Sequence, residues 1–120
     1  MRTRDEARAA WAECGLTVAD LTPADLADLR ATLDLEMRAS GLIRGSLRME
    51  GRVKTRTQSG RITRAELRCR SDYFNVRQAV TFERDGFVGF AGWADKVNVQ
   101  PVLNGFCTWA RDLAARRIAA

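Results

Sequence analysis

The chain contains no histidine and only three cysteines, which excludes several kinds of site. The cysteines are Cys14, Cys69 and Cys107, and none of them belongs to a C-x-x-C motif. An odd number of widely spaced cysteines indicates neither a disulfide framework nor a zinc site. Without histidine, imidazole ligands for metals and histidine general-base catalysis are also excluded. We therefore expect no metal site and no cofactor.

Long apolar segments are also lacking. No run approaches the ~20 apolar residues that a membrane-spanning helix needs. The chain begins with charged residues rather than with the apolar core of a signal peptide. The hydrophobic content of 46% and the charged content of 29% are typical of a folded domain, and 120 residues suit one domain. The sequence predicts a single cytoplasmic domain (residues 1–120) without a membrane segment.

Two helices are expected in the N-terminal third, over about residues 4–14 and 23–40. Thr3 is a predicted N-cap that accepts a hydrogen bond from the amide of Glu6, and Gly15 can adopt the left-handed conformation that ends a helix. Thr22 followed by Pro23 is a second helix start. Leucines at helical spacing follow it, which predicts an amphipathic helix.

A third helix is expected over about residues 99–117. Asn98 is its predicted N-cap, and Pro101 then falls in the first turn, where proline is tolerated. Gly105 weakens an isolated helix by roughly 1 kcal/mol relative to alanine, so we expect another element to pack closely there.

Between the second and third helices, apolar and polar residues alternate with the period of strands. The strands are expected at about residues 46–56, 62–70, 75–83 and 87–94. The predicted fold class is therefore α+β: two N-terminal helices, a four-stranded antiparallel β-meander, and a C-terminal helix packed on one face of the sheet.

Each hairpin is predicted to have a three-residue loop. For the first, a loop at residues 58–60 places Val53 opposite Ala65 and keeps the apolar residues on one face. That register also sets Lys54 beside Arg64, and Arg48 beside Arg70, as repulsive pairs. For the second, a loop at residues 84–86 places Phe82 opposite Val88 and Val80 opposite Phe90.

Positive charge is concentrated in the first hairpin. Residues 44–70 carry a net charge of +7, whereas residues 1–43 carry −3 and residues 71–120 carry +1. The alternation projects most of these cations from one face of the sheet, which predicts a site for an anionic partner. A solvated sheet face that needs no partner is the simplest alternative. The predicted binding residues are Arg48, Arg52, Lys54, Arg64, Arg68 and Arg70.

Beside these cations, the second hairpin has small side chains on the same face. They suggest a shallow floor that holds an anionic ligand or is covered by a second copy of the chain. The residues assigned to this possible groove are Arg77, Ala79, Thr81, Gly89, Ala91 and Trp93.

Nothing in the sequence indicates catalysis. Cys69 and Cys107 fall on apolar faces and have no histidine to activate them. We therefore expect a non-enzymatic accessory protein of bacterial or phage type, which forms a homodimer and binds an acidic protein or nucleic acid through its basic face. The alternatives are a protein that binds a small anionic ligand near Trp93 and a purely structural homodimer.

Overall fold

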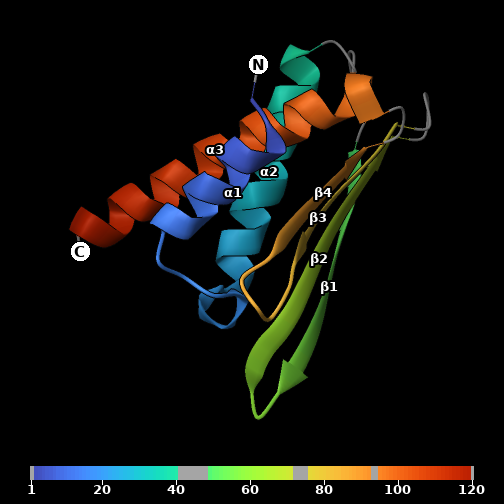
Figure 1. Ribbon diagram of the computed structural model, residues 1–120. Coiled ribbons are helices and arrows are strands. Elements are labelled where there is room, and N and C mark those ends of the chain that lie inside the picture. The colour runs from blue at the N-terminus through green and yellow to red at the C-terminus, as the bar shows by residue number, and fades with distance from the viewer. Residues whose placement is uncertain (1, 41–48, 72–75, 93–94, 120) are drawn as a thin grey trace.

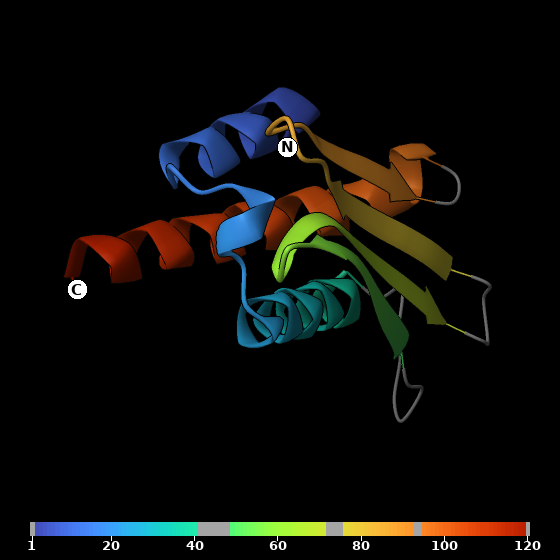
Figure 2. The ribbon, with the colours of Figure 1, turned by 90° about the horizontal axis from the view of Figure 1, so that it is seen from below.

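Three helices lie on one side of a four-stranded antiparallel sheet (Figures 1 and 2). The computed structural model describes residues 2–40, 49–71, 76–92 and 95–119, with side chains except at 49–52, 70–71, 76–77, 95–98 and 118–119. The strands are adjacent in chain order, β1-β2-β3-β4, which confirms the predicted α+β meander. The elements are α1 (Arg4–Glu13), the 3-10 turn η1 (Val18–Asp20), α2 (Pro23–Ala39), β1 (Met49–Gln58), β2 (Arg61–Ser71), β3 (Val76–Phe82), β4 (Val88–Gly92) and α3 (Asp95–Ala119).

The predicted signals at the start of the first two helices are confirmed. The Thr3 hydroxyl accepts a hydrogen bond from the amide of Glu6 at 3.1 Å, and Gly15 has a φ of 65° directly after α1. At α2, Thr22 and Asp25 each accept a hydrogen bond from the other's amide, at 3.1 and 2.9 Å. These bonds satisfy backbone donors that the first turn of a helix leaves unpaired.

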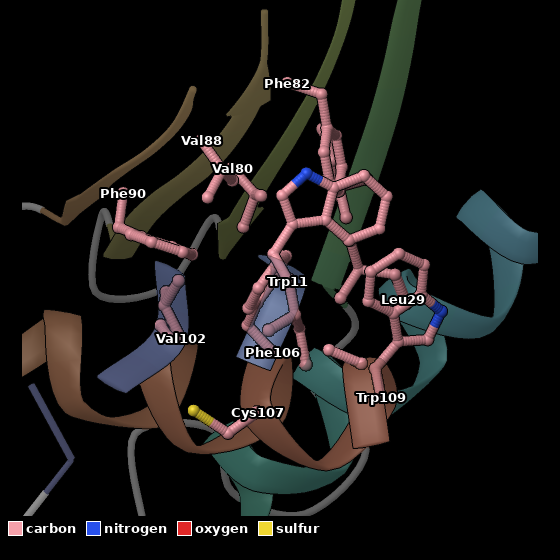
Figure 3. Close-up of a cluster of buried hydrophobic side chains, with 14 of the residues drawn as sticks. Trp11, Leu29, Val80, Phe82, Val88, Phe90, Val102, Phe106, Cys107 and Trp109 are labelled. Carbon is pink, nitrogen blue, oxygen red and sulfur yellow. The ribbon is translucent and has the colours of Figure 1, made fainter. Parts of the chain in front are cut away.

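Aromatic side chains from helices and strands meet in the core (Figure 3). Trp11 of α1 lies edge-on to Phe82 of β3, with ring centroids 5.0 Å apart, and Phe90 of β4 lies edge-on to Phe106 of α3 at 4.9 Å. Trp109 stacks on Trp11, and its ring nitrogen donates a 3.0 Å hydrogen bond to the carbonyl of Asp25. The core therefore joins all three helices to the inner face of the sheet.

The first hairpin has a different turn from the one predicted. Ser59 and Gly60 form a two-residue turn with φ of 52° and 78°, and Gln58 pairs with Arg61. A bulge then shifts the register between Arg56 and Thr57. The positive φ at both turn residues is the geometry of a tight hairpin turn, and the bulge returns the apolar residues to the inner face.

The predicted register of this hairpin is consequently wrong by two residues. Val53 pairs with Leu67 rather than Ala65, and Lys54 pairs with Glu66 rather than Arg64. A shift of two preserves the face of every side chain, so Ala65, Leu67 and Cys69 are buried as expected. The predicted Lys54–Arg64 repulsion is replaced by pairs of Arg52 with Arg68 and Arg56 with Arg64.

The second hairpin matches its prediction. Phe82 pairs with Val88 and Val80 pairs with Phe90. The amide of Glu83 donates to the carbonyl of Phe87 at 2.8 Å, which closes a three-residue loop, and Gly86 has the expected positive φ of 91°. A residue in this conformation at the third loop position is typical of hairpins with a bulge.

The C-terminal helix begins earlier than predicted. α3 starts at Asp95, so Asn98 lies inside the helix and is not its N-cap, and Pro101 follows six helical residues. Proline there removes one backbone hydrogen bond from the helix. The burial of Pro101, Val102 and Leu103 in the core stabilises this turn and offsets the loss. Although α3 has 25 residues, no helix in the described ranges is both long and apolar enough to cross a membrane.

Helix α2 packs against α3 at Gly105. A Cβ atom at this position would lie 2.9 Å from Cδ2 of Leu33 and 3.5 Å from its Cα. The close approach that Gly105 was predicted to permit is therefore present, and it joins the two longest helices.

We expect Gly105→Ala to lower the free energy of unfolding by about 1 kcal/mol. Overpacking the contact with Leu33 costs about 1–3 kcal/mol, and the better helix propensity of alanine returns only ~1 kcal/mol of that. Urea denaturation measures the change. In a Leu33→Ala background the 2.9 Å contact is removed and the closest remaining atom is Cγ of Glu36, at 3.3 Å on a flexible side chain, so the same substitution should become stabilising. An equal effect in both backgrounds would contradict this account of the contact.

Candidate binding face of the sheet

The sheet has one face that no helix covers. Side chains alternate along each strand. The core side chains of the sheet pack among those of the helices (Figure 3), so the intervening residues point away from the helices. We call this side the outer face. Its described side chains are Lys54, Arg56, Arg64, Glu66, Arg68, Ala79, Thr81, Glu83, Gly89 and Ala91.

Three of the six predicted cationic residues have described side chains, and all three lie on the outer face. Lys54 is exposed, the side chain of Arg68 is 66% exposed, and that of Arg64 is 32% exposed. For Arg52 and Arg70 only the backbone position is described. Their strand register places them on the same face, whereas Arg48 lies outside the described residues.

Glu66 lies between two of these arginines and neutralises part of their charge. Its carboxylate contacts Arg64 at 3.3 Å and also pairs with Arg68, and only 8% of the residue is exposed. Arg64 makes a second ion pair, at 3.2 Å, with Glu83 of the neighbouring strand edge. The hydrogen bond and charge of Glu83, together with Glu66, raise the pKa of the Arg64 guanidinium. Arg64 is thus held in place, while Arg68 remains accessible.

The predicted floor adjoins the arginines directly. Arg68 pairs with Ala79, and Ala79 pairs in turn with Ala91 of the edge strand. In the next row Glu66 neighbours Thr81, which pairs with Gly89. Ala79, Thr81 and Gly89 are half-buried and Ala91 is exposed. The remaining two groove residues are not tested: the side chain of Arg77 is not described, and Trp93 lies outside the described residues.

Sequence reasoning missed the outer end of the first hairpin. Every residue from Val53 to Arg61 is exposed, and this segment adds Arg56 and Arg61 to the predicted cations. Arg84, from the β3–β4 loop, donates a 3.3 Å hydrogen bond to the side chain of Gln58. The sequence did carry a signal for this cationic end: residues 51–65 contain five basic residues and no acidic one.

The three cysteines lie away from the outer face. All are buried, and burial raises the pKa of each thiol, that of Cys69 to about 11. The Cys14 thiol also donates to the carbonyl of Ala110 at 3.1 Å. Since the thiolate is the reactive form, none of these thiols is arranged as a nucleophile.

We expect the thiols to react with a disulfide reagent such as DTNB only after unfolding. At pH 8 a thiol with a pKa of 11 is about 0.1% thiolate, and burial blocks access in addition. Absorbance at neutral pH should therefore show little release of thionitrobenzoate, followed by three equivalents in guanidinium chloride. Rapid release of one equivalent from the folded protein would contradict this expectation.

The outer face thus combines exposed cations, internal ion pairs and a row of small side chains. Within the described ranges, no cluster of three acidic or cysteine side chains is arranged to hold a metal ion. Comparison of the chain with models of protein families, with curated proteins and with solved structures gives no match.

Proposed function

We propose that this protein is a non-enzymatic binding module whose outer face holds an anionic macromolecule, either a nucleic acid or an acidic protein. The observation that supports this most is the position of Arg68. It is largely exposed on a face without helices, and its strand neighbours Ala79 and Ala91 are small. A partner can therefore approach the sheet closely and meet a guanidinium group there.

The ion pairs on the outer face favour such binding. Arg64 is fixed by Glu66 and Glu83, so less side-chain freedom is lost when a partner contacts it. Arg68 shares Glu66 with Arg64, and its exposed nitrogen atoms remain available to a phosphate or carboxylate. Lys54 and Arg56 extend the cationic surface along β1, which should make the affinity depend steeply on salt.

A small anionic ligand on the floor is the alternative. It is favoured by the position of Arg68, which is the strand neighbour of Ala79 at the end of the row of small residues. Trp11 and Trp109 are buried in the core, so a ligand beside Trp93 would change the tryptophan fluorescence mainly through that residue. An unchanged spectrum across a set of anionic metabolites would count against this alternative.

In the expected homodimer a second copy covers the floor. Salt should strengthen this dimer, whereas salt weakens the binding of a polyanion. Two outer faces in contact would oppose the cations of one copy to those of the other, so salt would strengthen the dimer by screening them. Binding to a polyanion instead weakens as salt is added. The mass by size-exclusion chromatography with light scattering, at low and high salt, separates a dimer from the 13.4 kDa monomer.

The proposal predicts that Lys54→Gln with Arg68→Gln weakens retention on heparin, so that the protein elutes at a lower salt concentration. The matched control is Arg30→Gln with Arg111→Gln, which removes the same charge from exposed positions on α2 and α3. Glu66 keeps Arg64 as its partner in the first variant, so the fold should be retained. Equal elution of both variants, or no retention of the unmodified protein, would refute binding through the outer face.

A further inference from the structure

The first hairpin extends beyond the part of the sheet that the helices cover. β1 and β2 have 10 and 11 residues, whereas β3 and β4 have only 7 and 5. Figure 1 shows the β1–β2 turn projecting past the β3–β4 loop. We call residues 53–61, all of them exposed, the arm.

The chemistry of the arm is that of a nucleic-acid-binding segment. Residues 51–65 include five basic residues and no acidic one, and three of the basic residues, Lys54, Arg56 and Arg61, lie in the arm. The other side chains here are mainly hydroxyl and amide groups, which donate hydrogen bonds to phosphates and to base edges. They are Thr55, Thr57, Gln58, Ser59 and Thr63.

We infer that the arm enters the major groove of double-stranded DNA. This inference rests on the proposed function and narrows its partner to a duplex. Lys54, Arg56 and Arg61 are the contacts to phosphates and base edges, because all three are exposed. Lys54 and Arg56 lie on the outer side of the ribbon, and Arg61 lies beside the turn.

The dimensions of the arm suit this groove. The major groove of B-DNA is about 12 Å wide and 8.5 Å deep and admits a two-stranded ribbon. The two strands lie about 5 Å apart. β2 pairs with β3 as far as Ala65, so the part of the ribbon beyond the sheet runs from Arg56 to the turn, about 7 Å along β1 to Gln58 at 3.4 Å per residue. This free end is comparable in length to the depth of the groove, so the end of the ribbon can enter while the sheet body remains outside.

Other forms of nucleic acid fit the arm less well. Residues 51–65 contain no aromatic side chain, so they lack the stacking groups by which proteins commonly hold single strands. The major groove of duplex RNA is too deep and narrow for side chains to read. Duplex DNA is therefore the partner that the arm matches best.

The arm is also held in a defined shape before any partner binds. The Thr63 hydroxyl donates to the carbonyl of Arg56 at 3.3 Å across the bulge, and Ile62 at the base packs against the core. Arg84 ties the arm to the second hairpin through Gln58. A preformed ribbon loses less conformational freedom when it enters a groove.

The test uses fluorescence anisotropy with a labelled 24-base-pair DNA duplex, the matching single strand and a duplex RNA of the same sequence. The variant is Arg56→Gln with Arg61→Gln, and the control is again Arg30→Gln with Arg111→Gln. Asp20, whose charge interacts with Arg61, keeps its hydrogen bonds from Thr17 at 2.8 and 3.2 Å, so the variant should fold.

We expect the duplex DNA to bind most tightly. The slope of log affinity against log salt should fall by about 2 in the arm variant and remain unchanged in the control. Methyl green, which occupies the major groove, should displace the protein, whereas netropsin in the minor groove should not. Equal affinity of the arm variant and the control, or displacement by netropsin alone, would overturn the inference.

Failure of the inference can be distinguished from failure of the proposed function. If the protein is retained on heparin but binds no DNA duplex, the arm is not a DNA-binding element and an acidic protein becomes the partner of the outer face. If duplex binding is lost in Lys54→Gln with Arg68→Gln but kept in Arg56→Gln with Arg61→Gln, the outer face around Arg68 binds DNA and the end of the arm does not. If neither heparin nor DNA is bound, both proposals are wrong.

Discussion

Because helices cover the sheet on one side only, every side chain of the four strands points either into the core or into solvent. The core depends on this separation, since Leu67, Val80 and Phe90 come from neighbouring strands in one row of the inner face. An odd shift between two strands would move such residues to the outside. In the first hairpin the bulge between Arg56 and Thr57 prevents this, because the two-residue turn alone would produce an odd shift. The bulge is therefore as necessary to the core as any apolar residue in it.

The same separation concentrates charge on the outer face, and the sheet tolerates it by pairing part of that charge internally. Arg56 and Arg64 are direct neighbours of like charge, as are Arg52 and Arg68. Such pairs are unfavourable in a sheet. Glu66 and Glu83 offset the repulsion around Arg64. No described carboxylate plays this part for Arg56 on the exposed arm. The cost of the arrangement therefore increases toward the end of the hairpin, where an anionic partner would relieve it most.

Those features that depend on local signals were predictable from the sequence, and those that depend on a choice between equivalent pairings were not. Gly86 in a three-residue loop fixed the second hairpin, and with it the rows that join Ala79 to Ala91. The first hairpin has two solutions that keep the apolar residues inside: a three-residue loop, or a two-residue turn with a bulge. Hydrophobic alternation does not distinguish them, because the sequence carries no signal for the extra residue at Thr63.

The ion pair of Arg64 with Glu83 could not be predicted for a related reason: it depends on the register between β2 and β3. The early start of α3 was missed because proline is more common in a first turn than inside a helix.

The length of the first hairpin is not explained by the stability of the fold. A two-stranded ribbon that buries nothing is marginally stable in water, and ordering each of its residues costs about 1–2 kcal/mol in backbone entropy. The exposed residues 53–61 bury no apolar side chain in return; Val53 is 41% exposed although it pairs with the buried Leu67. The tight turn at Ser59 and Gly60, the bulge and the packing of Ile62 keep the ribbon ordered. Edge protection explains the charges on β1 and does not explain the extension, because a shorter edge strand protects a sheet better than a longer one. The partner contact that we propose would account for both the length and the charge of this hairpin.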